Sequence, residues 1–431
     1  MVFNRVLGDD EIDSLYDASV NNYKHNFEFE LPEEHSFKGY AIDSSGEKAE
    51  TERRSVTLGF NQRPVINNYT PKFTNQWVKD NQVLNFEVLD CLDTNGDTLR
   101  YEWKVDSVNV STRHQFSFDG GVYTLGSHSV RGYCYDEFGN FDSEEFNVEV
   151  IRSTDFTLVV LGDRQWDTIL KPEVNDAIVD WIINVKDYSG VEYVVQVGDL
   201  VMRGANNWEW ERIQNSLSKL DGIVKWSAIL GNHDYDTSKP HPTYGGTPTD
   251  RTSYKYNTYF DISRYQNYGY LGNSMGVDAD NYYTLFDVNG IEFMVMHYEM
   301  CPSDSTLSWV NNVIANNPNK KVIVVTHIQL YSDGEWVNNT KQVYHCNTAS
   351  NPRVRGNNGD KQFEKTLSKY TNIFLVLSGH VGDGAYRTDT GINGNKVHQI
   401  VTDFQGGDSP NPRFHDGWIR ILRFSPEEDK I

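Results

Sequence analysis

Metal-capable side chains recur in this sequence directly after short apolar runs. Five such runs each end in a small residue or a tight turn, and the side chains that follow them are Asp163 with Gln165, Asp199, Asn232 with His233 and Asp234, His327, and His380. Buried strands of open α/β sheets are short Val/Ile/Leu runs, and ligands collect beyond their carboxyl ends. A single Gly-Asp after a strand is usually a turn, but five junctions within one domain-sized stretch indicate a shared site. The spacing therefore predicts a metal site at the carboxyl edge of a sheet.

The donor types in this set indicate what the metals would do. Carboxylate, amide and imidazole donors suit Zn, Mn or Fe better than thiolate-seeking ions. Asp199 can bridge two ions through its two oxygens, and two cations about 3.5–4 Å apart can activate a shared water and clamp phosphate oxygens. His233, beside Asn232, is then placed to protonate the leaving oxygen, and Asp234 is expected to orient its imidazole. We expect hydrolysis of phosphomono- or diesters by attack of a metal-bound hydroxide.

Residues 153–425, about two thirds of the chain, resemble a calcineurin-like metallophosphoesterase of the secreted, multidomain type. The resemblance implies a sandwich of two mixed β-sheets flanked by helices, and two divalent metal ions. The residues that it implies for one ion are Asp163, Gln165 and Asp199, and those for the other are Asp199, Asn232, His327 and His380. It also implies a catalytic role for His233.

Two positions depart from the family pattern. The first motif usually reads Asp-x-His but is Asp163-Arg164-Gln165 here, as in a Gln-bearing subgroup. The last motif usually reads Gly-His-x-His, but Gly382 occupies the place of its second His and has no side chain to ligate with. His398 or Asp383 is a candidate replacement, with water as the alternative. We therefore expect the first metal to be weaker and more exchangeable than the second.

Substrate contacts are less well marked than the metal site. Arg164 and Arg387 are candidates for phosphate contact, with an exposed structural role as the alternative for each. Two polar insertions, 235–280 and 331–362, are expected to be irregular and to shape the substrate pocket, because such loops lie over sheet edges. The sequence leaves the choice between mono- and diesters open.

The order of the elements predicts an α/β domain over residues 152–431. From residue 152 onward, apolar strands alternate with segments whose apolar residues recur at helical spacing, namely 174–185, 208–220 and 308–315. The preceding residues are β-rich with turn residues between the runs. Residues 61–151 are long enough for an immunoglobulin-like sandwich, and the segment from Asp97 to Trp103 resembles the polycystic-kidney-disease repeat family.

The first 60 residues are harder to assign. Residues 21–60 are too short for a whole sandwich and are interpreted as a partial immunoglobulin-like, β-rich segment. Residues 1–20 resemble the closing strand and helix of a laminin-G-like domain, with a capped surface helix as the alternative. Modules of this kind suggest attachment to a cell surface or a glycan.

One turn in the β-rich part has oxygen ligands at alternate positions. Asp93-Thr-Asn95-Gly96-Asp97 is reminiscent of a calcium loop but has no downstream bidentate Glu. A plain hairpin turn is the alternative.

Charge and hydropathy exclude some classes of protein. The formal net charge of −22 argues against a general nucleic-acid binder, although bound cations would still allow a phosphate substrate. No run of 18 apolar residues is present, so no membrane span is expected. The first residues contain no signal-peptide core, and we interpret the chain as part of a longer secreted or cell-surface protein.

The four cysteines bear on the compartment. They allow three pairings, and only Cys91–Cys134 with Cys301–Cys346 keeps both bridges within the predicted domains. Disulfides in an oxidising compartment are favoured over four buried thiols.

A second hypothesis comes from another functional class. Gly382 and the acidic, modular chain would also suit a surface binding or adhesion protein whose phosphoesterase-like domain has lost turnover. The retained ligand set argues against it, and so does His233, because that residue is expected to serve catalysis rather than packing. We therefore favour a metal-dependent phosphoric ester hydrolase.

Overall fold

The computed structural model describes residues 34–42, 45–57, 61–237, 248, 250–340, 346, 356–404 and 417–431. The segment 1–20, interpreted above as a laminin-G-like remnant, lies outside them. The described residues fall into two compact units, one drawn from 1–70, 87–116 and 131–145, the other from 71–86, 117–130 and 146–431.

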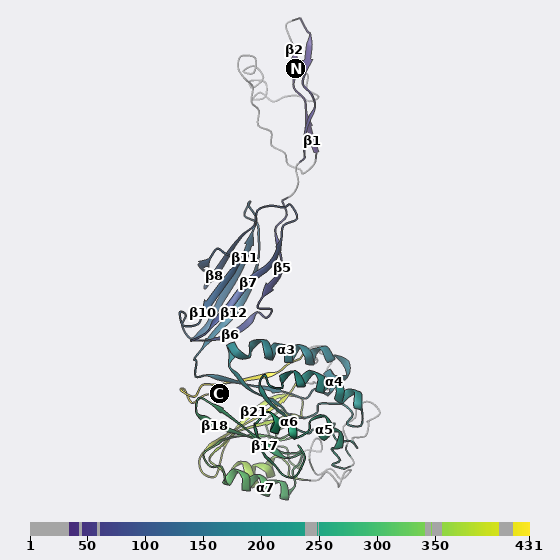
Figure 1. The fold of residues 1–431 in the computed structure, drawn as a ribbon, viewed down its shortest axis with the longest axis vertical. Helices are drawn as coiled ribbons and strands as arrows, with labels where there is room; N and C mark the ends of the chain where they lie inside the picture. The colour runs from purple at the N-terminus through teal and green to yellow at the C-terminus, as the bar shows by residue number, and fades with distance from the viewer. Residues whose placement is uncertain are drawn as a thin grey trace. The chain divides into compact units, whose positions relative to one another are not determined.

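The N-terminal β region, residues 34–151, contains strands and no helices among its described residues. Its strands are β1 Glu34–Phe37, β2 Tyr40–Ile42, β3 Lys48–Glu50, β4 Arg54–Thr57, β5 Val65–Thr70, β6 Asn75–Lys79, β7 Val83–Leu92, β8 Arg100–Val105, β9 Val108–Ser111, β10 Gln115–Asp119, β11 Gly126–Tyr135 and β12 Phe141–Ile151 (Figure 1). Two larger sheets have the strand orders β10-β7-β5 and β6-β12-β11-β8-β9, beside the pairs β1-β4 and β2-β3. The all-β prediction is confirmed, whereas the module boundaries at 20, 60 and 151 stay predictions.

Two mixed sheets form the centre of the second unit. The first has the order β15-β14-β13-β23, and the second has the order β16-β17-β18-β19-β20-β22-β21. Their strands are β13 Phe156–Leu161, β14 Val191–Gln196, β15 Lys225–Ala228, β16 Leu271–Ser274, β17 Tyr282–Val288, β18 Ile291–His297, β19 Lys321–Val325, β20 Ile373–Ser378, β21 Asp383–Thr390, β22 Lys396–Asp403 and β23 Arg420–Phe424. Strands β13, β14 and β15 run parallel, as do β18, β19, β20 and β22, so each set ends at one common edge.

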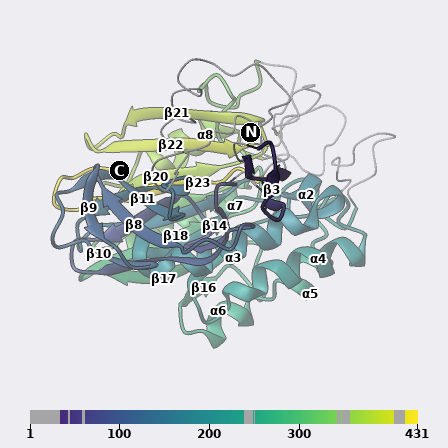
Figure 2. The same cartoon turned by 90° about the horizontal axis from the view of Figure 1, so that it is seen from above.

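Helices cover the outer faces of these sheets. They are α2 Gln165–Leu170, α3 Pro172–Ser189, α4 Asn207–Leu217 with the 3₁₀ turn η1 Ser218–Leu220, α5 Tyr254–Tyr259, α6 Ser263–Asn267, α7 Asp304–Ala315, and α8 Gly359–Gln362 continued by the π-helical turn η3 Phe363–Leu367. Figure 2 shows α3 and α4 along one flank of this unit, with β21 and β22 on the opposite side. The three predicted helices are confirmed in α3, in α4 with η1, and in α7.

Strand β13 shows how the layers are built, because all six of its residues are buried. Phe156, Leu158 and Val160 belong to the core cluster that also contains Ile323 of β19. Val159 and Leu161 belong instead to the cluster that includes residues of α3 and α4. Because successive side chains of a strand point to opposite faces, this pattern fits a strand between a second sheet and a helix layer.

The insertion 235–280 differs from the expectation of an irregular loop. It contains α5 and α6, and its aromatic side chains Tyr256, Phe260 and Tyr265 are fully buried in the helix-side core. Large aromatic rings gain enough from burial to order a segment rich in Gly and Asp. Part of this insertion, and part of 331–362, lies outside the described residues.

Both expected disulfides are present, Cys91–Cys134 and Cys301–Cys346, and no cysteine is free. The alternative of four thiols is therefore wrong. Paired cysteines of this kind persist in oxidising environments, which points to a secreted or extracellular protein. Among the described helices, none has the length and apolar character needed to cross a membrane.

Candidate metal centre

The predicted ligands lie at the carboxyl ends of parallel strands from both sheets. Asp163, Asp199 and Asn232 follow β13, β14 and β15 of the first sheet, while His327 and His380 follow β19 and β20 of the second. Since both sets of strands end on the same side, side chains far apart in sequence meet at one edge.

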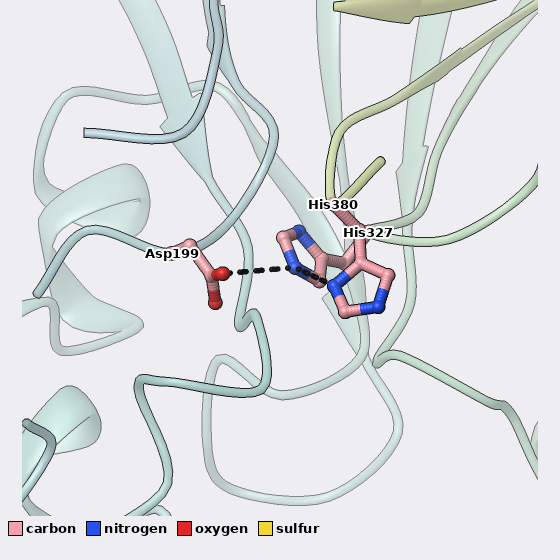
Figure 3. A group of neighbouring side chains, drawn as sticks. All are labelled: Asp199, His327 and His380. Carbon is pink, nitrogen blue, oxygen red and sulfur yellow. Dashed lines mark hydrogen bonds and ion pairs between the residues drawn. The ribbon is translucent and has the colours of Figure 1, made fainter. Parts of the chain in front are cut away.

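Asp199, His327 and His380 form the closest group (Figure 3). One donor atom of each lies within 4.8 Å of the others. His327 Nε2 is 3.4 Å from Asp199 Oδ2, 3.2 Å from Asn232 Oδ1 and 3.2 Å from His380 Nδ1. Three donor groups from three other strand ends thus converge around one imidazole nitrogen.

The outer nitrogen of His327 fixes the orientation of its ring. Nδ1 lies 2.8 Å from the carbonyl oxygen of Val197 and donates to it, so Nε2 faces Asp199 and Asn232. Because the backbone carbonyl accepts from Nδ1, it selects the tautomer that carries its hydrogen on Nδ1 and leaves Nε2 free to ligate a metal.

Glycines allow the ligands to pack this closely. A Cβ at Gly231 would lie 2.0 Å from Asp199 Oδ1, and one at Gly198 would lie 2.4 Å from His327 Nδ1. Asp199 and His380 themselves have φ values of 55° and 71°. Non-glycine residues hold this left-handed conformation only at a cost, and such residues cluster at functional sites.

Asp163 and Gln165 form the side of the centre expected to hold the first metal. The backbone N–H of His380 lies 3.2 Å from both carboxylate oxygens of Asp163. Gln165 donates from Nε2 to Asp199 Oδ2 at 3.2 Å, while its Oε1 is buried and has no hydrogen-bond partner among the described residues. A buried carbonyl oxygen without a donor is costly, and a cation would satisfy it. The residues present therefore fit a divalent cation.

The electrostatics of the centre favour bound cations as well. Burial, together with the negative charges of Asp403 and Asp199, raises the pKa of Asp163 well above its usual range. Burial also raises the pKa of Asp199, but the charges of His327 and the other histidines outweigh it and lower that pKa overall. Burial and the charge of His327 lower the pKa of His380 to about 3, which keeps this imidazole neutral and able to ligate.

His233 lies at the edge of this group, with its side chain 13% exposed. Its Nδ1 lies 2.9 Å from the carbonyl oxygen of Met202, and its Nε2 lies 3.9 Å from Asp199 Oδ2. The orienting group is therefore Met202, not Asp234 as expected. Asp234 is fully buried and accepts the backbone N–H groups of Leu200, Val201 and Gly231, so it shapes the loops instead.

The two candidate arginines are engaged elsewhere. Arg164 is buried, forms an ion pair with Asp167 and donates to Asn175 at 2.9 Å. Arg387 binds Asp389 through two nitrogens and lies over a tryptophan ring. Each guanidinium is thus held by a nearby carboxylate, and the role of either arginine in phosphate contact stays a prediction.

Neither candidate replacement for the ligand missing at Gly382 belongs to the group formed by Asp199, His327 and His380. The ring of His398 lies 2.8 Å from the hydroxyl of Tyr386 on the neighbouring strand, and Asp383 is exposed. A Cβ at Gly382 would meet no atom within 4 Å, so this position opens into free space.

Asp403 is a buried carboxylate of the centre that sequence reasoning missed. It is the last residue of β22 and only 5% exposed, and a Cβ on Gly162 would lie 3.6 Å from its Cα. Its charge contributes to the raised pKa of Asp163. The run Val397–Asp403 carries only a weak sequence signal, since the strand that ends in this carboxylate also contains His398, Gln399 and Thr402.

Comparisons with known proteins show which family the chain belongs to. The model of the calcineurin-like phosphoesterase family matches residues 156–383. An uncharacterised protein of Bacillus subtilis, YvnB, is 24% identical over 283 residues, which cover 64% of this chain and 19% of that protein. The chain thus spans about a fifth of the length of this curated relative.

Two solved structures are similar at low sequence identity. A purple acid phosphatase from yellow lupin (Lupinus luteus) seeds is 13% identical, with a TM-score of 0.37, over 89% of this chain and 70% of its own. A putative 5'-nucleotidase from Staphylococcus aureus is 12% identical, with a TM-score of 0.36, over 64% of this chain and 52% of its own. Since the family model matches more than half of its residues, the chain belongs to the calcineurin-like phosphoesterase family.

Proposed function

We propose that this chain is a metal-dependent phosphoesterase that hydrolyses phosphomono- or diesters outside the cytosol. The observation that carries the proposal is the convergence of Asp199, Asn232, His327 and His380 at one sheet edge, within reach of the imidazole of His233. Membership of the calcineurin-like phosphoesterase family supports metal-dependent phosphoester hydrolysis as the general chemistry.

Two divalent cations, Zn, Mn or Fe, suit these donors. Asp199, Asn232, His327 and His380 would hold one, and Asp163, Gln165 and Asp199 the other. When bound, such cations lower the pKa of a water nucleophile and neutralise charge on the phosphoryl oxygens.

His233 is proposed to assist the leaving group. Its Nδ1 hydrogen is held by the Met202 carbonyl, which leaves Nε2 to carry and donate a proton. Asp199 Oδ2 lies 3.9 Å from this nitrogen, which places the imidazole beside the candidate ligands. His233 retains a fixed imidazole, which favours turnover over the alternative of a surface protein that only binds.

Asp403 is proposed to take the place of the ligand absent at Gly382. It lies on the strand parallel to β20, which delivers His380, and it is buried beside Asp163. A carboxylate in this position can ligate the first cation directly or hold one of its waters.

The proposal is tested by stripping the chain of metal and restoring Zn, Mn, Fe or Ca singly. Hydrolysis of para-nitrophenyl phosphate and of its bis-ester separates mono- from diesterase activity. We expect turnover that depends on the added ion, that is retained when the exposed Asp187 is changed to Asn, and that is lost in Asp199→Asn. Absence of turnover on both esters with every ion would overturn the proposal in favour of a binding protein.

The N-terminal β region is proposed to attach the enzyme to a cell surface or a glycan. The support is limited to its all-β architecture and to the acidic, disulfide-bonded character of the chain. Pull-down of the chain by purified cell-wall glycans tests this part independently of catalysis, and no retention would remove it.

A further inference from the structure

A second group of carboxylates lies in the N-terminal β region, outside the metal centre described above. We name Asp93, Asp97 and Asp136 the aspartate cluster. One carboxylate oxygen of each lies within 4.8 Å of the others. Asp93 is the first residue after β7 and Asp136 the first after β11, while Asp97 lies in the loop that leads to β8.

A disulfide explains why two of these residues converge. Cys91 and Cys134 are bonded to each other, and each stands two residues before an aspartate of the cluster. Side chains two residues apart on an extended segment point to the same face. The bridge therefore brings Asp93 and Asp136 together at the ends of their strands, even though 43 positions separate the cysteines in sequence.

The loop after β7 is folded around one oxygen of Asp93 and leaves the other oxygen unused. Oδ1 accepts the backbone N–H of Asn95 at 2.8 Å and that of Asp97 at 3.3 Å. Oδ2 is buried and has no hydrogen-bond partner among the described residues, and the whole residue is only 8% exposed. Oδ2 of Asp97 is likewise buried without a described donor. A bound cation would satisfy both of these buried acceptors.

The third carboxylate is held in place by amides. Asp136 is fully buried, and its Oδ2 accepts from Asn61 at 2.7 Å and from Asn140 at 2.8 Å. Its Oδ1 accepts two backbone N–H groups of the loop after β11. These bonds fix the carboxylate without neutralising its charge.

Nothing among the described residues balances the negative charge of the cluster. No Lys or Arg of the described chain forms an ion pair with any of the three aspartates. Burial, and then the charges of Asp93, Glu137 and Asp136, raise the pKa of Asp97. Like charges this close repel each other unless protons or a cation neutralise them.

We propose that the aspartate cluster is a Ca²⁺ site that ties the loops after β7 and β11 together. All of its donors are oxygens, which suits a hard cation, and Ca²⁺ accepts the irregular geometry of carboxylates drawn from separate loops more readily than Mg²⁺ does. Asn95, which alternates with the aspartates in sequence, is not a ligand through its side chain, because its Oδ1 accepts the backbone N–H of Gln62. Asp136 supplies the carboxylate that an EF-hand takes from further along its own loop.

The test is calcium titration of the full chain by calorimetry after chelation. Changing both Asp93 and Asp97 to Asn should remove one equivalent of bound Ca²⁺, whereas Asp90→Asn, at an exposed position three residues before Asp93, should retain it. His327→Ala removes a predicted ligand of the phosphoesterase centre and should leave the Ca²⁺ ion of the aspartate cluster bound. Terbium luminescence excited through tyrosine should fall in parallel in the double variant.

The single variant Asp97→Asn changes only the half-buried loop carboxylate and keeps the test open if the double variant does not fold. We expect it to weaken calcium binding at least tenfold, with an unchanged circular dichroism spectrum. The proposal is overturned if folded Asp97→Asn binds Ca²⁺ as the parent does, or if His327→Ala abolishes all calcium binding.

Discussion

Stability at acid pH should depend on one buried histidine that joins the two sheets of the phosphoesterase unit. His297, the last residue of β18, is fully buried, its Nε2 lies 2.6 Å from Ser227 Oγ on β15, and its ring stacks on Tyr282. Its Nδ1 has no described partner. Burial lowers the pKa of His297 to about 3, so the folded chain holds this ring neutral where the unfolded chain protonates it.

The sign and size of the effect follow from this difference. Because the pKa of His297 is lower in the folded state, the stability it contributes is present above about pH 6.5 and is lost as the pH falls toward 3. At pH 5 the folded ring is still neutral, whereas the ring of the unfolded chain is protonated. The free energy of unfolding is therefore about 2 kcal/mol lower at pH 5 than at pH 7. By pH 3 the loss reaches about 4 kcal/mol, because the folded ring is then about half protonated as well.

The substitution His297→Phe keeps the stacked ring and removes the titration. At pH 7 the variant should be less stable than the parent by about 1–3 kcal/mol, because Ser227 loses its hydrogen-bond partner. Between pH 7 and pH 5, however, the free energy of unfolding of the variant should fall by about 2 kcal/mol less than that of the parent. Urea unfolding in metal-free buffer measures both, with the exposed His114→Gln as control. Equal pH dependence in parent and His297→Phe would refute the reasoning.

Three further predictions concern the centre itself. Asp199→Asn should abolish turnover and metal binding at this centre. The circular dichroism spectrum should be retained, since an amide oxygen can still accept the backbone N–H of His233, which donates to Asp199 Oδ1 at 2.9 Å. Retained activity would contradict a bridging role. His233→Asn should lower kcat roughly 10²–10⁴-fold, and more for alkyl than for nitrophenyl esters, because poor leaving groups need the proton most. Gly231→Ala should reduce metal content, as its Cβ would lie 2.0 Å from Asp199 Oδ1, whereas Gly382→Ala should not.

Strand ends were the part of the fold that could be predicted best. Apolar runs such as 156–161 are buried on both faces, so their composition alone identifies them, and parallel strands bring their ends together. The insertion 235–280 was predicted poorly, because Gly, Asp and Pro indicate turns. The burial of Tyr256 and Tyr265 that orders it depends on partners distant in sequence.

The candidate site could likewise be predicted only in part. The structure brings Asp199, His327 and His380 together as the sequence pattern predicts, because each follows its strand directly. The orientation of His233 was not predictable, since its partner is a backbone carbonyl, which has no signature in a sequence. Arg164 stays a candidate phosphate contact by position, and the structure adds its ion pair with Asp167, which lies one helical turn away.

The asymmetry between the two halves of the centre yields a prediction about metal content. Around His327 Nε2, donor atoms lie at 3.2–3.4 Å on three sides, whereas the half that contains Asp163 lacks the side chain that Gly382 replaces. If Asp403 fills that place, Asp403→Asn should release about one metal ion per chain and leave the other bound, as elemental analysis after dialysis would measure.

Gly382→His supplies the complementary test, because the position is open and its backbone does not require glycine. In the Asp403→Asn background it should restore the lost ion, since an imidazole there completes the usual motif. Two ions bound equally tightly in Asp403→Asn would show that Asp163, Gln165 and Asp199 suffice, and that the carboxylate of Asp403 serves the fold rather than the metal.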